Sequence, residues 1–321
     1  MSIHYAPLSE FALLKIENED SANFLQGQLS QDINAVQGDK ALLASYSNPK
    51  GRVFATLLLW QDTHIKTTYY ALVTADNAAF LQKRLSMFIL RSKVKITQLN
   101  PSIMGIWSAD TQALQAHFEE FTPLWQTTTT ADNKPRFTVA AVDNQYLIHC
   151  PSADNMTRVL SINLAENTIA TDNFRLSDSK VWQQQDILAA IPWIGERTRE
   201  VFVAQSINQD AIGAINFKKG CYPGQEVIAR SHYLGNLKRR TLIAILDYAV
   251  EDIQSLLASD VLEGENPIGQ VVNAVSLNNK TYLLIEVQLR SIEDGANIYL
   301  ANVPDIALQT QNVPYSLDKP E

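Results

Sequence analysis

The chain has 321 residues, a mass of 35.8 kDa and a formal net charge of −8. This length is typical of about two domains, and 46% apolar with 19% charged residues indicates a folded globular protein. The acidic balance argues against a generally basic nucleic-acid coat, and two cysteines exclude a disulfide framework or a four-thiolate iron–sulfur cluster held by this chain alone.

The N-terminus shows no targeting signal. Residues 1–20 lack the basic start and the apolar run that a secretory signal peptide has. The longest apolar stretches, such as 53–60, are far shorter than the ~20 residues of a membrane-spanning helix. We therefore expect a soluble cytoplasmic protein with no membrane partner.

Helix and strand patterns alternate in the first part of the chain. The spacing predicts a helix from Ser21 to about Gln31, and the turn sequence Asn48–Gly51 predicts a β-hairpin between strands 42–46 and 53–60. Asp76 is the expected cap of the next long helix, and Asp110 is the expected cap of the short helix at 113–118. The other predicted elements are strands at 70–74, 94–96, 103–107, 137–142 and 146–150, and helices at 113–118, 153–164 and 180–190.

From about residue 240 the pattern changes to strands, with one short helical stretch at 251–257. These strands are predicted at 241–246, 268–274, 282–289 and 298–300. The sequence therefore predicts an α+β region over residues 1–239 and an all-β domain over residues 240–321. Strand periodicity does not distinguish a barrel from a sandwich.

One segment stands out by its charge. Residues 217–240 read FKKGCYPGQEVIARSHYLGNLKRR and hold six Lys and Arg residues against the single acid Glu226, a net charge of +5. A basic patch on an acidic protein is a candidate anion site. Charge runs are also typical of a solvated helix face, and charge alone favours that simpler interpretation.

The same segment places Cys221 ahead of a predicted helix. Pro223 suits the first helical position and Gly235 is a typical left-handed terminator, so the helix is predicted between them. The helix N-terminus and the two lysines just before Cys221 favour its thiolate form. The alternative is a small core residue, which is our interpretation of Cys150 at the end of its strand.

At this segment the chain resembles a known family. Residues 219–230, KGCYPGQEVIAR, closely resemble the K-G-C-Y-x-G-Q-E signature of the YgfZ family of folate-binding proteins, relatives of the glycine-cleavage T-protein. The resemblance continues along the chain in FLQGQ with Asp32 at 24–32, KGR at 50–52, AIP at 190–192, FVAQ at 202–205 and PYSL at 314–317. Ala190 and Ala204 replace a glycine and a proline that are usual in the family, which puts only local loop shape in doubt.

The resemblance implies a fold and a ligand. The fold consists of two ferredoxin-like subdomains and a C-terminal β-barrel, arranged as a ring around a cavity of folate size. The implied ligand is tetrahydrofolate, with aromatic contacts at Trp182 and Phe11. A flat pterin suits stacking on such rings, and the basic side chains of Lys218 and Arg230 suit the anionic glutamate tail. Core packing is the alternative role for both aromatic residues.

Three functions are compatible with these residues. The first, which the family resemblance implies, is a folate-binding accessory factor that supports assembly or repair of iron–sulfur proteins and thereby tRNA modification. The clients that the resemblance implies include a tRNA-methylthiolating radical enzyme. In this function Lys219 and the helix end stabilise the thiolate form of Cys221, and Gln225 and Glu226 orient the thiol. The second is a folate-dependent one-carbon transferase of the aminomethyl type. Strand 52–60 lacks the carboxylate that such an enzyme uses.

The third function is an RNA-binding module, which the acidic net charge disfavours. We therefore expect folate and iron–sulfur client or assembly proteins as partners, and no direct nucleic-acid binding. The five histidines show no paired ligand spacing, so no metal site is expected. We further expect a monomer without classical catalytic activity.

Overall fold

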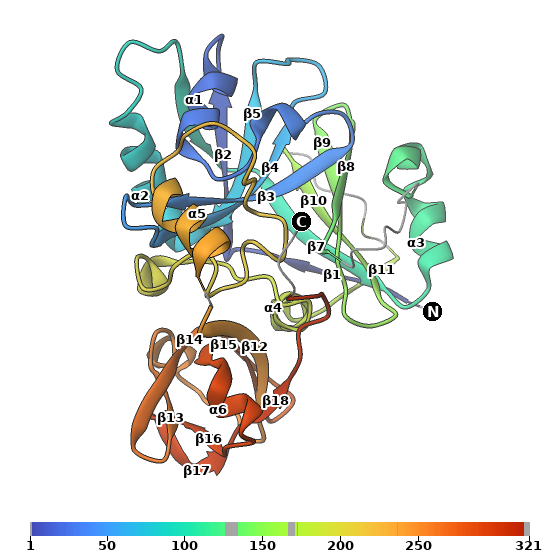
Figure 1. The fold of residues 1–321 in the computed structure, drawn as a ribbon. Helices are drawn as coiled ribbons and strands as arrows, with labels where there is room; N and C mark the ends of the chain where they lie inside the picture. The colour runs from blue at the N-terminus through green and yellow to red at the C-terminus, as the bar shows by residue number, and fades with distance from the viewer. Residues whose placement is uncertain (1, 126–133, 166–170, 172, 236, 318–321) are drawn as a thin grey trace.

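Two β-sheets organise the chain in the computed structural model, which describes residues 2–125, 134–165, 171, 173–235 and 237–317 (Figure 1). The larger sheet has eleven strands in the order β11-β1-β7-β10-β9-β8-β3-β4-β5-β2-β6. Its strands are β1 (Ile3–Pro7), β2 (Phe11–Glu17), β3 (Lys40–Ser47), β4 (Val53–Gln61), β5 (Tyr69–Thr74), β6 (Lys95–Leu99), β7 (Ser102–Ser108), β8 (Phe137–Val142), β9 (Gln145–Cys150), β10 (Thr157–Asn163) and β11 (Phe174–Leu176).

The larger sheet consists of two halves joined where β3 pairs with β8. Successive side chains of a strand point to opposite faces, and this alternation divides the core. Leu13 and Ile148, one from each half, meet in a shared central core. Their neighbours Leu14 and Leu147 belong instead to two outer cores. Helices α1 (Ser21–Gln28) and α2 (Ala75–Ser86) cover one outer face, and α3 (Thr111–His117) covers the other.

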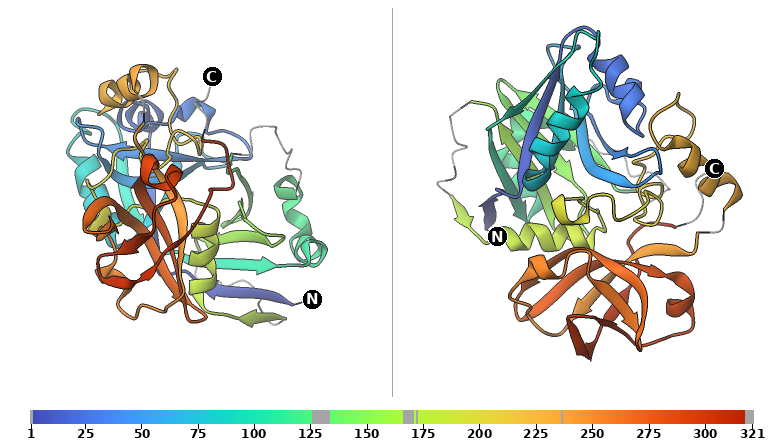
Figure 2. Two further views of the ribbon diagram at one scale, coloured as in Figure 1. Left: turned by 60° about the horizontal axis from the view of Figure 1, so that its bottom comes forward. Right: turned by 90° about the vertical axis from the view of Figure 1, so that its left-hand side faces the viewer.

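The smaller sheet has seven strands and curls around a core of its own at one end of the molecule (Figures 1 and 2). Its strands are β12 (Arg239–Leu246), β13 (Asp260–Glu263), β14 (Asn266–Leu277), β15 (Lys280–Gln288), β16 (Ile298–Leu300), β17 (Val303–Ala307) and β18 (Gln309–Gln311), with the short helix α6 (Leu289–Glu293) after β15. The division of the chain into domains at residues 239 and 240 stays a prediction.

Helix α4 (Ser179–Leu188) lies between the two sheets, as both views of Figure 2 show. The segment after α4 is joined to β14 by two reciprocal hydrogen bonds. The Trp193 amide donates to Asn273 Oδ1 over 3.1 Å, and Asn273 Nδ2 donates to the Trp193 carbonyl over 2.7 Å. The last described residues then run back from the smaller sheet to the segment after α4, where the Tyr315 hydroxyl donates to the Ala190 carbonyl over 2.9 Å.

Most predicted elements are confirmed, including the hairpin of β3 and β4 and the cap of α3, where the Asp110 side chain accepts from the Ala113 amide. The helix predicted at 153–164 is wrong, because β10 occupies this stretch. β10 lies between β7 and β9 and is almost wholly buried, so it lacks the alternation that identifies a half-exposed strand. The polar run Thr127–Thr130, followed by Pro135, indicates a loop by sequence, and it lies outside the described residues.

Two smaller expectations are also corrected. Asp76 lies inside the first turn of α2 rather than at its cap, which is Thr74, and its carboxylate accepts from the Glu196 amide over 3.0 Å. The helical stretch predicted at 251–257 is a single 3₁₀ turn, η4 (Ile253–Ser255). At the start of α2 the Ala75 amide donates to the Glu10 carbonyl and Asp76 binds Glu196, so contacts with distant residues fix where this helix begins.

Ala190 adopts a left-handed backbone conformation, with φ of +52°. This conformation costs a residue with a β-carbon about 1–2 kcal/mol, whereas glycine loses about 0.5–1 kcal/mol through its greater freedom in the unfolded chain. We expect Ala190→Gly to raise the free energy of unfolding by about 0.5–1 kcal/mol in urea denaturation. Ala116→Gly, at an exposed position in α3, is the control and should lower it by a similar amount. A loss of stability in Ala190→Gly would contradict the strain argument.

Candidate functional site

Cys221 is exposed, and the residues around it hold it in place. It belongs to a stretch of irregular backbone at residues 218–224, named here the cysteine loop. Lys219 and Tyr222 on either side of the thiol are 9% and 8% exposed. The loop is therefore pinned at two buried points, with the thiol displayed to solvent between them.

The Lys219 ammonium group is bound by the backbone at the end of α1. It donates to the carbonyl oxygens of Gln26 and Leu29, both at 2.6 Å, and of Gln31 at 3.0 Å. These bonds use all three protons of the ammonium group. Burial lowers the pKa of Lys219 to about 8, with the nearby Asp32 carboxylate opposing the shift. In this structure Lys219 fastens the cysteine loop to α1.

This anchoring predicts a clear difference between two neighbouring lysines. Lys219→Met leaves three carbonyl oxygens without their charged donor, so we expect the free energy of unfolding to fall by about 2–4 kcal/mol. Lys218→Met, at the exposed neighbouring position, should change it by less than about 0.5 kcal/mol. Chemical denaturation followed by circular dichroism measures both. Equal effects of the two substitutions would show that the three hydrogen bonds contribute little.

Helix α5 (Gln225–Leu234) follows the cysteine loop and starts two residues later than predicted. Its N-cap is Gly224, with φ of +83°, and a β-carbon there would lie 2.6 Å from the Asn48 carbonyl oxygen. Glycine thus lets the helix start pack against the β3–β4 turn. Gly235, the predicted left-handed terminator, is instead extended, with φ of −95°.

The other motif residues support the loop from neighbouring elements. Gln225 Nε2 donates to the Lys219 carbonyl over 3.4 Å, whereas Glu226 is exposed on α5. Gln205 Nε2 donates to the Ile228 carbonyl of α5 over 2.5 Å. The structure therefore places Gln225 against the loop backbone, and it places Glu226 at the surface.

The second cysteine contrasts with the first. Cys150 ends β9 and is buried, and burial raises the pKa of its thiol to about 12. Thiolate is the reactive form of cysteine, so Cys150 is unsuited to chemistry near neutral pH. Its position agrees with its interpretation as a core residue.

The two predicted folate-stacking residues have different surroundings. The Trp182 ring is 3% exposed and lies beneath the Arg158 guanidinium, whose Cζ is 4.7 Å from the ring centroid. It also packs against Gly105, where any β-carbon would collide with it. Phe11, in contrast, lines a cavity of about 400 Å³ between the two sheets, and Trp182 is not among the described residues that line it.

This cavity, named here the Phe11 cavity, combines aromatic rings with carboxylates. Trp193 lies edge-on to Phe11, with ring centroids 4.8 Å apart. Glu10 accepts from Gln183 Nε2 over 3.1 Å, and Asp186 accepts from Trp193 Nε1 over 3.0 Å. Burial, together with the Asp186 charge, raises the pKa of the Glu10 carboxyl. The cavity suits a flat heterocycle that carries hydrogen-bond donors.

The basic segment 217–240 does not form one patch. Arg239 pairs with Glu286 over 3.0 Å, and Arg240 lies in a buried ion pair. Lys218 lines a cavity other than the Phe11 cavity. Arg230 is exposed on α5. The sequence pattern overestimated this patch because it counted residues whose charges are neutralised by distant acids.

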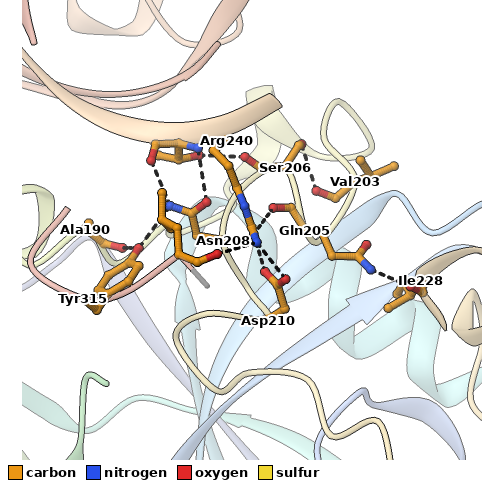
Figure 3. A network of polar contacts seen from close by, with 11 residues as sticks. Ala190, Val203, Gln205, Ser206, Asn208, Asp210, Ile228, Arg240 and Tyr315 are labelled. Atoms are coloured by element: carbon orange, nitrogen blue, oxygen red, sulfur yellow. Dashed lines mark hydrogen bonds and ion pairs between the residues drawn. The ribbon is translucent and has the colours of Figure 1, made fainter. Parts of the chain in front are cut away.

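The segment 204–210 forms a buried polar junction between the sheets (Figure 3). The sequence does not predict this junction, although Gln205 and Tyr315 belong to motifs that carry the family resemblance. Arg240 donates to both carboxylate oxygens of Asp210, over 2.6 and 3.1 Å. Asn208 Nδ2 donates to the Thr241 carbonyl over 2.8 Å and to the Tyr315 hydroxyl over 3.3 Å. Nothing in the local pattern identifies these partners, because they are 30 to 107 residues apart.

The part of the chain that the structure describes contains neither a candidate metal site nor a candidate membrane-spanning helix. It contains no group of three His, Cys, Asp or Glu side chains that could hold a metal ion. None of its helices is long and apolar enough to cross a membrane.

Known proteins resemble this chain in sequence and in fold, although no family model matches it. The tRNA-modifying protein YgfZ of Yersinia pseudotuberculosis serotype IB (strain PB1/+) is 31% identical over 321 residues, covering 97% of this chain and 92% of the relative. The protein of that name from Vibrio atlanticus (strain LGP32) is 25% identical over 319 residues, with the same coverage.

The glycine cleavage system aminomethyltransferase T from Bartonella henselae has a similar solved structure. It superposes with a TM-score of 0.74 over 98% of this chain and 87% of its own, at 11% sequence identity. This likeness concerns the fold alone, and it confirms the predicted T-protein-like fold class.

Proposed function

This chain belongs to the family of the tRNA-modifying protein YgfZ, and on that premise we propose that it is a tetrahydrofolate-binding accessory factor with a functional thiol at Cys221. Its task is to support the assembly or repair of iron–sulfur proteins, and through them tRNA modification. It acts as a cytoplasmic monomer, and its partners are folate and iron–sulfur client or assembly proteins.

The observation that carries the folate proposal is the Phe11 cavity. The reduced pterin of tetrahydrofolate is flat along its pyrimidinone half, which carries an amino group and a ring N–H side by side. A carboxylate matches such a pair of donors, and aromatic walls cover the ring faces. Glu10 supplies the carboxylate, because Arg158 and Trp193 already bind the two oxygens of Asp186. Phe11 covers one face of the ring, and Trp193, which lies edge-on to Phe11, closes the side.

The residues that the family resemblance assigns to one folate site do not lie together in the structure. Lys218 lines a different cavity from Phe11, and Trp182 is enclosed by Arg158 and Gly105. We therefore assign the pterin to the Phe11 cavity. In this assignment Trp182 does not touch the pterin, and it packs beneath Arg158, which pairs with the cavity residue Asp186 over 2.7 Å.

The proposal for the Cys221 thiol rests on its exposure to solvent and not on neighbouring catalytic groups. Cys221 is exposed on a loop that Lys219 and Tyr222 anchor, so a partner protein can reach it without unfolding. The β4 sequence contains neither Asp nor Glu, which speaks against a one-carbon transferase with its acid–base group on that strand. We therefore propose that Cys221 serves a client protein and that the chain turns over no folate.

A titration of tetrahydrofolate followed by tryptophan fluorescence tests the ligand site. We expect saturable quenching in the wild type, and Phe11→Ala should weaken binding by roughly tenfold, because stacking on an aromatic ring is worth about 1–3 kcal/mol. Phe88→Ala removes a phenylalanine that is 41% exposed on another surface, and it should bind as the wild type does. Cys221→Ala should also keep its affinity. Absence of saturable quenching in the wild type would refute the folate proposal.

A further inference from the structure

A group of exposed apolar side chains lies on the connection between α2 and β6. Eight large apolar side chains are exposed in the part of the chain that the structure describes, and three of them, Met87, Phe88 and Leu90, belong to this connection. Leu90 is 90% exposed. Single exposed apolar residues are common on soluble proteins, whereas a group of them marks a contact surface.

Neighbouring residues hold this connection in one shape. The Ser92 amide donates to the Ile89 carbonyl over 2.8 Å, which closes a turn over residues 89–92, named here the Leu90 turn. Ile89 packs against the outer core that α1 and α2 cover. The Arg84 guanidinium supports the Phe88 ring, with Cζ 5.6 Å from the ring centroid. The exposed apolar side chains are therefore presented on a fixed frame.

The backbone at the tip of the Leu90 turn is strained. Leu90 has a φ of +47°, in the left-handed region that glycine adopts readily and that a residue with a β-carbon avoids. The exposed leucine side chain gains no burial in return, so the stability of this chain alone favours glycine here. Strained backbone of this kind is concentrated at binding and catalytic sites. What this position supplies is therefore the leucine side chain itself.

The surroundings of the Leu90 turn are positively charged in a chain of net charge −8. Residues 83–95 hold five Lys and Arg residues and no Asp or Glu. Two of the five pair with Glu17 and Glu19. Lys83 and Arg91 are exposed, and neither forms an ion pair with any residue that the structure describes. Carboxylates on a partner therefore complement the edge of this apolar surface.

Helix α1 joins the Leu90 turn to the cysteine loop. At its start the Lys93 amide donates to Asp20 Oδ2 over 2.7 Å, and the Asp20 amide donates to the Lys93 carbonyl over 3.2 Å. At its end the carbonyl oxygens of Gln26 and Leu29 bind Lys219 of the cysteine loop. A helix of 8 residues is about 12 Å long, and a specific interface covers about 800 Å² on each partner. One partner can therefore contact both features.

We propose that the Leu90 turn is the docking surface for the protein that Cys221 serves, and that this partner has an apolar pocket surrounded by carboxylates. Leu90 enters the pocket, and Lys83 and Arg91 face the carboxylates. This inference rests on the proposed function, in which the partner is an iron–sulfur client or assembly protein. It adds the surface that holds the partner, and no residue of this surface is among the described residues that line the Phe11 cavity.

A protein partner agrees with these charges better than a membrane or a second copy of the chain does. Lipid-binding clusters hold about four to eight cations, whereas two of the five cations here are already paired. A two-fold contact between two copies would bring the same unpaired cations face to face. An acidic protein surface meets neither difficulty.

Leu90→Gly tests whether the leucine is present for docking. Glycine relieves the strained backbone, so the midpoint of urea denaturation should rise. The fraction of methylthiolated tRNA, in cells whose only copy of the protein is this variant, should nevertheless fall by about threefold or more, because an anchoring side chain is lost. Tetrahydrofolate affinity should stay unchanged. Full methylthiolation with Leu90→Gly would overturn the proposal.

The expression level separates docking from the chemistry of the thiol. Raising the expression of Leu90→Gly by about twentyfold should restore methylthiolation, because mass action offsets a weaker contact. Cys221→Ala should stay inactive at the same level, since it lacks the thiol. A Leu90→Gly defect that high expression does not relieve refutes the docking surface alone. Normal methylthiolation with Cys221→Ala refutes the proposed function instead.

Two pairs of matched variants control for general effects of surface substitution. Leu90→Asp and Arg91→Glu should each lower methylthiolation at the natural expression level. Leu176→Asp and Arg175→Glu change an exposed leucine and an exposed arginine on β11, at the other end of the strand order from β6, and they should leave it unchanged. Equal losses in the two pairs would contradict a specific surface at the Leu90 turn.

Two other occupants of the Leu90 turn are tested with the purified protein. The wild type should not bind anionic phosphatidylglycerol vesicles in a flotation assay, and it should sediment as a monomer. Vesicle binding that Leu90→Asp abolishes would assign the turn to a membrane surface and overturn the proposal. Self-association that Leu90→Asp abolishes would assign it to a second copy of the chain, with the same consequence.

Discussion

Asp210→Ala is expected to lower the free energy of unfolding by about 3–5 kcal/mol, because it leaves a buried guanidinium without its partner. The two side chains of the Asp210–Arg240 pair are 1% and 4% exposed. Arg240 also donates to the Gln205 carbonyl over 2.9 Å, so the pair joins β12 to the segment between the sheets. Urea denaturation measures the loss.

An exposed ion pair and a double substitution control this prediction. Asp247→Ala removes a carboxylate that lies 3.4 Å from Lys280 at the surface, and it should cost less than about 1 kcal/mol. Replacing both partners, in Asp210→Leu with Arg240→Met, should recover much of the stability lost in Asp210→Ala. If Asp210→Ala costs no more than Asp247→Ala, the buried pair is not what joins the sheets.

Cys221→Ala is expected to abolish the support of iron–sulfur enzymes while leaving the fold intact. The thiol is exposed, so its removal should change the free energy of unfolding by less than about 0.5 kcal/mol. The proposed function depends on this thiol, because burial keeps the thiol of Cys150 protonated. The measurement is the fraction of methylthiolated tRNA in cells whose only copy of the protein is the variant.

The control for this experiment is the other cysteine. Cys150→Ala should keep tRNA methylthiolation, with at most a moderate loss of stability from the small cavity it leaves. Cys221→Ser separates thiol chemistry from polarity and should behave as Cys221→Ala does. Full methylthiolation with Cys221→Ala would show that the cysteine loop acts through its shape or contacts rather than through its sulfur.

The structure also explains why the motifs around the cysteine loop, from residue 24 to residue 230, lie so far apart in the sequence. Residues 24–32 supply the carbonyl oxygens that bind Lys219, and the turn before Arg52 packs against Gly224. Arg52 and Val203 form a β-bridge that brings residues 202–205 alongside. These motifs are therefore parts of one support for the cysteine loop, whereas the motifs at 190–192 and 314–317 are joined to each other by the hydrogen bond from Tyr315 to Ala190.

Local patterns predicted most elements of the fold and failed where distant contacts decide the structure. The β3–β4 hairpin and the α3 cap were predicted because their signals lie within a few residues. β10 was mistaken for a helix because a central strand is buried on both faces and loses its alternation. The sequence places the start of α5 two residues too early, because Gly224 packs closely against the β3–β4 turn, which lies more than 170 residues earlier in the chain.

For the site, the sequence by itself determined the family, the place of Cys221 just ahead of a helix and the core character of Cys150, whereas the exposure of Cys221 came from the structure. Only the tertiary structure decided which groups meet each lysine, arginine and tryptophan. Lys219 turned out to bind carbonyl oxygens of α1, Arg240 to pair with Asp210, and Trp182 to be enclosed by Arg158. The physical reason is that a charge or a ring acts on whatever lies within a few ångströms, and here those neighbours are 24 to 193 residues away along the chain.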